Sequence, residues 1–482
     1  MKNISAEIDT FVTEYLKELR EDNAAVFVGA GMSRGAGYVD WAGLLSPIAK
    51  ELGLDASKES DLVGVAQFHV NQNATNRHGL NQLLIDEFSD LKEPTENHRL
   101  LSRLPIATYW TTNYDRLIEG GLQAAGKRVD AKYTVEQLAT TKRGRDAVVY
   151  KMHGDIEHPD KAVLTKDDYE RYHRSHAPFI TALAGDLVER TFLFLGFSFT
   201  DPNLDYVLGR IRATFATNQR RHFCLMKKRM RGKGESTRDH QYAVNRQLLV
   251  IQDLMRFNIK TLFVDDYIDI TSILETIVNR FRRRTVFVSG SADEYGPWGR
   301  SPTEGFLVRL AAALIQKDFR IASGFGLGIG GAIVTGATQQ IYSSKVRSID
   351  EQLILRPFPV GITDPAERLR TFGRYREEML AQAGIAIFVM GNKSSSGSIV
   401  DADGMKAEFA LSKKLGLYPV PIGASGFVAA QIWTEVMSEF DTFFPGHGKN
   451  VKNLMARLGK TTANPDDLLN TVIELVVLLS KE

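Results

Sequence analysis

The sequence predicts an α/β protein of two units, each built on a mainly parallel sheet. Short apolar runs alternate with segments of helical periodicity along the chain, which is the pattern of strands joined by crossover helices. Several runs end in glycine-rich or polar turns, the position where parallel sheets carry their binding sites. At 482 residues the chain exceeds what one hydrophobic core usually covers, so two folded units are expected.

The first unit has a Rossmann-like plan. Its expected strands are Ala24–Val28, Ile106–Thr111, Ala147–Met152, Thr191–Gly196, His222–Met226 and Lys260–Val264. The helical segments between them include Trp41–Leu52, Leu80–Phe88 and Leu204–Arg212. Residues 55–103 and 160–189 are longer than a crossover requires and predict a helical lobe that walls a cleft at the carboxyl edge of the sheet.

A helix over Ile270–Arg284 closes the first unit, so the expected domains are residues 1–283 and 284–482. A second Rossmann-like unit then begins. Its expected strands are Thr285–Val288, Phe319–Ala322, Leu353–Leu355, Ile385–Met390 and Tyr418–Ile422. The last helix, Pro465–Ser480, starts with a proline, whose missing N–H costs nothing in a first turn.

Composition excludes several classes of protein. The net charge is +2 on 60 basic and 58 acidic residues, which gives no bulk attraction to nucleic acid or to an anionic membrane. The basic cluster at residues 227–233 lacks interleaved aromatics and is expected to be a solvated loop. Neither a secretion signal nor a membrane-spanning run is expected, so the chain reads as cytoplasmic. Cys224 is the only cysteine, which excludes a disulfide framework and a four-cysteine zinc site.

A small-residue loop, Gly29-Ala30-Gly31 followed by Ser33, comes directly after the first strand. Small residues let the backbone approach a pyrophosphate, and the next helix offers unpaired N–H groups. The spacing is not GxGxxG, so the alternative is an ordinary tight turn.

Polar residues end two further strands: Asn113 and Asp115 follow one, and His153-Gly154 follows another. Taken singly, Asn and Asp at such positions often cap helices, and a histidine is often a surface or core residue. Their order after the glycine loop indicates a site at one sheet edge.

These segments resemble the sirtuin family. Gly37, Asp40 and the aromatic Trp41 fall in register with its GAGxSxxxG loop and the segment that follows, although Val39 and Ala42 replace the family's proline and arginine. Asn113, Asp115 and His153-Gly154 match its Asn, Asp and catalytic His-Gly, and Gly196-Phe197-Ser198 matches the Gly-x-Ser that meets the ribose.

The resemblance implies NAD+ as substrate. Cleavage of the nicotinamide–ribose bond passes through an oxocarbenium-like state, which needs polar groups at the reacting carbon and a base. His153 would be that base, Asn113 would hold water or ribose hydroxyls, and Asp115 would accept from the nicotinamide amide. Gly196, Ser198 and Asp201 would contact NAD+, although Asp201 alternatively only starts the next helix.

The missing zinc cysteines favour NAD+ hydrolysis over protein deacylation, with no cofactor and no zinc expected. Two alternatives to NAD+ hydrolysis stay open. One is an NAD-dependent deacylase, and the other is a non-catalytic nucleotide-binding assembly protein. Whether NADP is used, and whether NAD+ is hydrolysed or cyclised, is open as well.

The second unit carries two glycine-rich turns on one sheet edge, which suggest a nucleotide pocket. The candidate residues are Gly290, Ser291, Gly326, Gly328, Arg376, Lys393 and Glu408. Arg376 and Lys393 would bind phosphates, and Glu408 would accept hydrogen bonds from ribose hydroxyls or an adenine amine. Arg376 is alternatively a solvated helix residue, and Lys393 a charge at a loop tip.

This half is similar to the SLOG nucleotide sensors but lacks the Pro-Gly-Gly-x-Gly-Thr element of the related enzymes, so binding is preferred to catalysis. A sirtuin-like unit followed by SLOG resembles the effector family of the bacterial Thoeris antiphage systems. That resemblance implies an NAD+ hydrolase activated by a cyclic ADP-ribose isomer, which a TIR-domain partner makes. It also implies a homotetramer or filament, with Arg376, Lys393 and Glu408 as ligand-binding positions.

Overall fold

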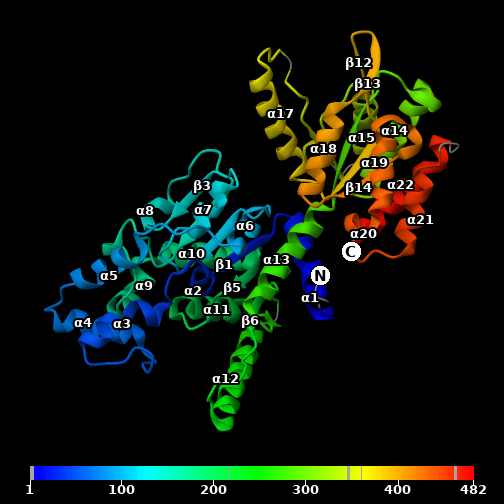
Figure 1. Ribbon diagram of the computed structural model, residues 1–482. Helices are drawn as coiled ribbons and strands as arrows, with labels where there is room; N and C mark the ends of the chain where they lie inside the picture. Colours follow the sequence, from blue (N-terminus) through cyan, green and yellow to red (C-terminus); the bar gives the residue numbers. More distant parts are fainter. Residues whose placement is uncertain (1–4, 216–217, 345–347, 360, 461–463, 482) are drawn as a thin grey trace. The chain divides into compact units, whose positions relative to one another are not determined.

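The computed structural model describes residues 5–215, 218–344, 348–359, 361–460 and 464–481 (Figure 1). The chain forms two compact units, Met1–Val278 and Asn279–Glu482, each with its own sheet. The division falls inside helix α13 (Tyr267–Arg282), whereas the boundary expected from the sequence follows residue 283. Across the described ranges, no helix combines the length and apolarity that a membrane crossing requires.

Unit 1 is built on a seven-stranded parallel sheet of order β3-β4-β2-β1-β5-β6-β7. The six strands expected from the sequence are all present, and β3 is an additional edge strand. Their bounds are β1 (Ala24–Val28), β2 (Thr108–Thr111), β3 (Val129–Lys132), β4 (Ala147–Lys151), β5 (Thr191–Leu195), β6 (His222–Lys227) and β7 (Ile259–Val264). Central strands β1, β2 and β5 are buried along their whole length because helices cover both faces.

The helices of unit 1 divide into a lobe and a set that packs on the sheet. Helices α3 (Trp41–Glu51), α4 (Leu62–Gln72), α5 (His78–Phe88) and α9 (Lys166–Ser175) lie together at one end of the unit (Figure 1). Leu45, Val65 and Leu80 from the first three share one apolar cluster. Helix α10 (Ala177–Glu189) falls within the predicted lobe region but packs on the sheet, with Phe179 and Leu183 against Phe192.

The other helices of unit 1 precede the first strand or lie between strands. They are α1 (Ala6–Arg20), α2 (Ala30–Ser33), α6 (Glu96–Ser102), α7 (Leu117–Ala124), α8 (Val135–Leu138), α11 (Pro202–Phe215) and α12 (Thr237–Met255). Helix α12 is unusual, because Leu254 is its only buried residue over 19 positions.

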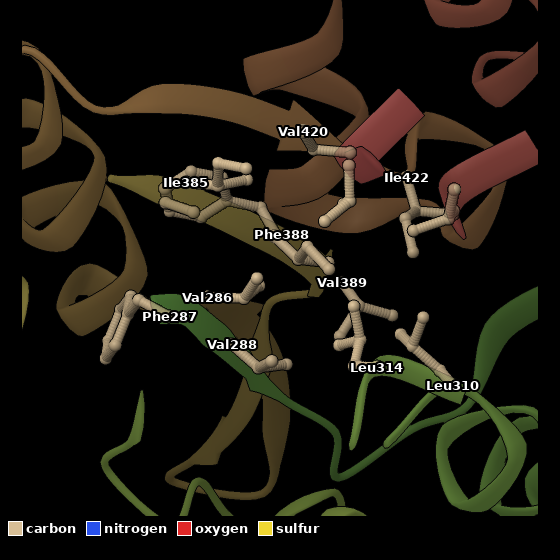
Figure 2. Close-up of a cluster of buried hydrophobic side chains, with 14 of the residues drawn as sticks. Val286, Phe287, Val288, Leu310, Leu314, Ile385, Phe388, Val389, Val420 and Ile422 are labelled. Atoms are coloured by element: carbon tan, nitrogen blue, oxygen red, sulfur yellow. The ribbon is translucent and has the colours of Figure 1, made fainter. Parts of the chain in front are cut away.

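Unit 2 is built on a five-stranded parallel sheet of order β10-β9-β8-β11-β14. The strands are β8 (Thr285–Ser291), β9 (Arg320–Ser323), β10 (Leu353–Leu355), β11 (Ile385–Met390) and β14 (Tyr418–Pro421), close to the five expected. Figure 2 shows part of its core, where Val389 of β11 lies near Leu310 and Leu314, and Val286 and Val288 of β8 belong to the same cluster.

The helices around this second sheet are α14 (Arg300–Gln316), α15 (Gly330–Tyr342), α16 (Ile349–Gln352), α17 (Pro365–Leu380), α18 (Asp403–Lys414), α19 (Phe427–Ser438), α20 (Phe440–Phe443), α21 (Lys449–Leu458) and α22 (Pro465–Lys481). A hairpin that the sequence did not predict, β12 (Asn392–Ser395) with β13 (Ser398–Asp401), follows β11.

Both sheets reverse their strand order beside their first strand. In unit 1 the reversal lies between β1 and β5, and in unit 2 between β8 and β11. Connections leave such neighbouring strands in opposite directions, which opens a crevice at their carboxyl ends. The small-residue loop after β1 and the glycine-rich turn after β8 therefore lie at the positions where parallel sheets bind ligands.

Candidate active site

A cleft of about 1390 Å³ opens at the carboxyl edge of the first sheet. It is lined by eleven of the twelve residues that the sequence suggested for this unit. These are Ala30, Gly31, Ser33, Asp40, Trp41, Asn113, Asp115, His153, Gly196, Ser198 and Asp201. Gly29 is the exception, since it lies beneath the cleft surface.

The glycines after β1 and β5 let two backbones meet. Gly29 N–H donates to Leu195 O and Gly31 N–H to Gly196 O, each over 2.9 Å. A Cβ on Gly29 would lie 2.5 Å from Gly196 O, and Gly196 has a φ of +62°. Because these two N–H groups are already used, a bound pyrophosphate would need other donors of the loop.

Asp40 and Trp41 begin helix α3 at the cleft wall. Asp40 Oδ1 accepts the Gly43 N–H over 3.0 Å, which is a helix cap, and its other oxygen lies 3.4 Å from Arg34. The Trp41 ring stacks on Tyr114, with ring centroids 6.3 Å apart. The loop after β1 is thereby fixed to the loop after β2.

Asn113, Ser33 and Asp115 form a hydrogen-bonded chain. Asn113 Nδ2 donates to Ser33 Oγ over 3.0 Å, and Ser33 Oγ donates to Asp115 Oδ2 over 2.7 Å. Asp115 Oδ1 also accepts the Leu117 N–H. Since both carboxylate oxygens are engaged, Asp115 holds the loop in place, in addition to any contact with an amide.

His153 faces Asp201 across the cleft floor. Nε2 of His153 lies 3.1 Å from Oδ2 of Asp201, and both side chains are buried. Nε2 has no hydrogen-bond partner among the described residues, and an ion pair between the two side chains forms only when the imidazole is protonated. Tyr169 donates its hydroxyl to the same Asp201 oxygen over 3.4 Å.

Asp201 also caps helix α11, because its Oδ1 accepts the N–H groups of Asn203 and Leu204. Burial raises the pKa of Asp201, but His153 and these backbone donors outweigh it and hold the pKa below its usual range. The two interpretations of Asp201 from the sequence are therefore compatible: it starts the helix and it lines the site.

A buried lysine that the sequence did not single out lies under these loops. Lys151 ends β4, and its Nζ donates to the carbonyls of Tyr114 and Asp115. It also pairs with Asp155 and, over 3.3 Å, with Glu119. Burial lowers the pKa of Lys151, but the surrounding carboxylates raise it above its usual value. A charged residue inside an apolar run was the available signal.

The cleft extends past β6 to helix α12, and the sequence did not predict that residues of this helix line the site. Lys227 and Arg229 of the predicted solvated loop line it, as do Tyr242 and Arg246 of α12. Tyr242 and Arg246 are spaced four residues apart, as on one face of a helix, but no sequence motif marks them as site residues.

The residues suggested for unit 2 lie at the end of β8, on the loop after β9, on β12 and on helices α17 and α18. Ser289, next to Gly290 and Ser291, donates to Glu408 Oε2 over 2.6 Å. Arg376 lies 3.6 Å from Glu408 and over the Phe358 ring. Its side chain is 14% exposed, so the solvated-helix alternative is wrong.

The two loops of unit 2 touch, and Lys393 lies apart from the buried pair. A Cβ on Gly326 would lie 1.9 Å from Gly290 O, and Gly328 has a φ of +74° and approaches Ala292 O. Lys393, on β12, pairs with Asp403 over 2.6 Å and is half exposed. The Arg376–Glu408 pair is thus buried beside the glycine turns.

Comparisons with known proteins match two parts of the chain to two different families. Residues 107–251 match the model of the SIR2-like domain, and residues 269–479 match that of the Sir2- and TIR-associating SLOG family. The chain is 50% identical over 473 residues to the NAD(+) hydrolase ThsA of Bacillus cereus (strain MSX-D12), covering 98% of each chain.

More relatives carry the same name. The chain is 48% identical over 477 residues to the NAD(+) hydrolase ThsA of Acinetobacter baumannii (strain 532279), covering 97% of this chain and 98% of the relative. Defense-associated sirtuin 2 of Bacillus subtilis is 27% identical over 223 residues, which is 44% of this chain and 22% of that protein.

Proposed function

This chain belongs to the family of NAD(+) hydrolases named ThsA, and we propose that it cleaves NAD+ to nicotinamide and ADP-ribose in the cleft of unit 1. The observation that carries this proposal is the meeting of Asn113, His153 and Asp201 with two close-packed glycine turns at the reversal of the sheet. Dinucleotides bind at such reversals in parallel sheets.

The reaction needs one bond broken and one formed. The bond between C1′ of the ribose and the nicotinamide nitrogen breaks, and its electron pair leaves with nicotinamide. Positive charge then spreads over C1′ and the ring oxygen, as in glycoside cleavage. Water adds to C1′ and gives up a proton, which His153 accepts and passes to solvent.

Asn113 is suited to hold that water. Its Nδ2 is committed to Ser33, and its Oδ1 accepts no hydrogen bond from the residues that the structure describes. A carboxamide oxygen fixed in this way can accept from a water or a ribose hydroxyl. Asp201, ionised beside His153, offsets the charge that the imidazole gains when it takes the proton.

We further propose that unit 2 regulates this activity. The buried Arg376–Glu408 pair beside the glycine turns supports a pocket for a phosphate-bearing nucleotide, with Lys393 at its exposed side. Its ligand would be a cyclic ADP-ribose isomer made by a TIR-domain partner. Its binding would favour an active homo-oligomer, a tetramer or filament, and so deplete NAD+ in antiphage defence.

The test is nicotinamide release from NAD+ by the full chain, alone and with each of several cyclic ADP-ribose isomers. His153→Ala should abolish release, while His173→Ala, at an exposed histidine of α9, should leave it unchanged. Arg376→Ala should remove the response to the isomer. Absence of release under every condition, with NAD+ still bound, would leave a nucleotide-binding scaffold, and turnover of acyl-lysine peptides would indicate a deacylase.

A further inference from the structure

The part of the cleft beyond β6 carries cationic side chains. Lys227 and Arg229 follow the strand, and Arg246 projects from α12, all three on the cleft surface. No carboxylate from β6, α12 or α13 lines the cleft within the described ranges. The acidic residues that do line it, Asp40, Glu96, Asp115 and Asp201, come from other loops and from α6.

Arg246 differs from the other two cations. Arg229 is paired with Glu235, and Lys227 lies 3.5 Å from Asp266 and over the Tyr267 ring. Arg246 has no ion-pair or hydrogen-bond partner among the residues that the structure describes. Its guanidinium is therefore available to an anion in the cleft.

Gln247, the residue next to Arg246, joins helix α12 to the end of β6. Gln247 Nε2 donates to Lys227 O over 2.9 Å, and Gln247 Oε1 accepts the Arg229 N–H over 3.0 Å. These bonds join α12 to the end of β6. Tyr242, one turn before Arg246, is 67% exposed and offers an aromatic face to the same cleft.

The strand order indicates which half of a dinucleotide would reach this wall. Asn113 follows β2, the glycine turns follow β1 and β5, and Lys227 ends β6. Three strand spacings, about 14 Å, separate the β2 loop from β6. With the nicotinamide ribose at Asn113 and His153 and the diphosphate at the glycine turns, the adenosine half lies at β6 and α12.

We propose that this wall recognises a phosphate on the adenosine ribose, so that the enzyme accepts NADP+ as well as NAD+. Sites selective for NAD+ place an Asp or Glu at the ribose 2′-hydroxyl, whereas an arginine accommodates a 2′-phosphate. The wall has the second pattern, with Arg246 as the free cation. An arginine fork can pair with two phosphate oxygens at once. The inference rests on the proposed use of the cleft for NAD+.

Arg246 also lines a second, smaller cavity that contains acidic side chains. This cavity of about 310 Å³ is lined by Arg246 together with Asp205 and Asp253. Asp253 is bonded to Arg256, and no ion pair joins Arg246 to either acid. A rotation of Arg246 toward Asp205 would remove it from the cleft, which the experiment below detects.

The test compares two probes that differ only in the 2′-phosphate, adenosine 2′,5′-bisphosphate and adenosine 5′-monophosphate. Both are titrated calorimetrically into the full chain, so no activation is required. The bisphosphate should bind at least tenfold more tightly, and Arg246→Ala should remove that advantage while Arg246→Lys retains part of it. Arg238→Ala, elsewhere on α12, should keep the wild-type ratio.

Turnover then separates this proposal from the one on which it rests. Nicotinamide release from both NAD+ and NADP+, with Arg246→Ala raising the ratio of KM for NADP+ to KM for NAD+ at least tenfold, would support it. Equal binding of the two probes, or release from NAD+ without release from NADP+, would overturn it and leave the NAD+ hydrolase intact. Release from neither substrate, alone and with each of the cyclic ADP-ribose isomers, would overturn the hydrolase itself.

Discussion

Asp201 performs two tasks that a single substitution can separate. It caps α11 through Oδ1 and faces His153 through Oδ2. Asparagine is as good a helix cap as aspartate but carries no charge. Asp201→Asn should therefore keep the stability of the protein and lower kcat for nicotinamide release by about tenfold or more, because the imidazolium loses its partner.

The pH dependence of this variant is part of the prediction. Since the folded pKa of Asp201 is below its usual value, the residue stays ionised from pH 5 to pH 9, and the variant should be less active than wild type at every pH in that range. Asp205→Asn, in the next turn of α11, is the matched control and should be as active as wild type. Wild-type kcat in Asp201→Asn would show that the charge of Asp201 does not serve the reaction.

Lys151 is the second residue that carries a prediction. Removing one partner from a buried ion cluster leaves the other charges uncompensated, which typically costs about 3–5 kcal/mol. Lys151→Met should lower the free energy of unfolding by that amount, measured by urea denaturation, since Glu119 and Asp155 remain buried.

Two further variants identify the cause of that loss. Adding Glu119→Gln to Lys151→Met should cost less than the sum of the single changes, because the two residues interact. Lys161→Met, at an exposed lysine near the same loop, should have little effect. Strict additivity of the first pair would contradict the ion-cluster account.

At the scale of elements, Gly196 determines how the turns after β1 and β5 meet. A Cβ there would lie 2.5 Å from Met32 N, and the φ of +62° disfavours any side chain. Left-handed strain alone costs about 1–3 kcal/mol. Gly196→Ala should lower the melting temperature and abolish nicotinamide release, whereas Gly185→Ala, in open space on α10, should slightly raise stability. Unchanged activity in Gly196→Ala would mean that the site tolerates separated turns.

The elements that sequence reasoning predicted and missed differ in where their stability originates. Strands such as β1 and β11 are continuous apolar runs, so their composition alone predicts that they are buried. Strand β3 contains Asp130 and Lys132, which are buried because they pair with each other over 2.9 Å and with further polar groups, Arg145 for the aspartate and the Thr140 carbonyl for the lysine. The hairpin of β12 and β13 is serine-rich and largely exposed. A hydrophobicity pattern therefore predicts neither strand β3 nor this hairpin.

The candidate site shows the same limit. Residues at strand ends could be brought together from sequence, because parallel strands share one carboxyl edge. The contact of His153 with Asp201, and the stripe of α12 on the cleft, depend on loop and helix placement over more than forty residues. The sequence therefore predicted that the strand-end residues share one cleft, and it missed the cleft wall formed by α12.

At the scale of the whole molecule, acid should weaken the chain through unit 1. His222 begins β6, and its Nδ1 accepts the Phe192 N–H over 3.1 Å. Burial lowers the pKa of His222 to about 3 from an ordinary 6.5. Between those values the unfolded chain binds a proton that the folded chain does not, so stability falls as the pH falls, by up to about 1.4 kcal/mol per pH unit. His98, whose pKa burial lowers to about 4, adds to this trend.

His222→Asn tests the argument, because the asparagine oxygen can accept the same N–H without titrating. Urea unfolding between pH 7 and pH 4 should give a shallower fall in the free energy of unfolding for this variant than for wild type, with the remaining slope due to His98 and other groups. His173→Asn, at an exposed histidine, should retain the wild-type slope. Equal slopes for His222→Asn and wild type would mean that His222 is protonated in the folded protein, and that the first sheet does not hold it neutral.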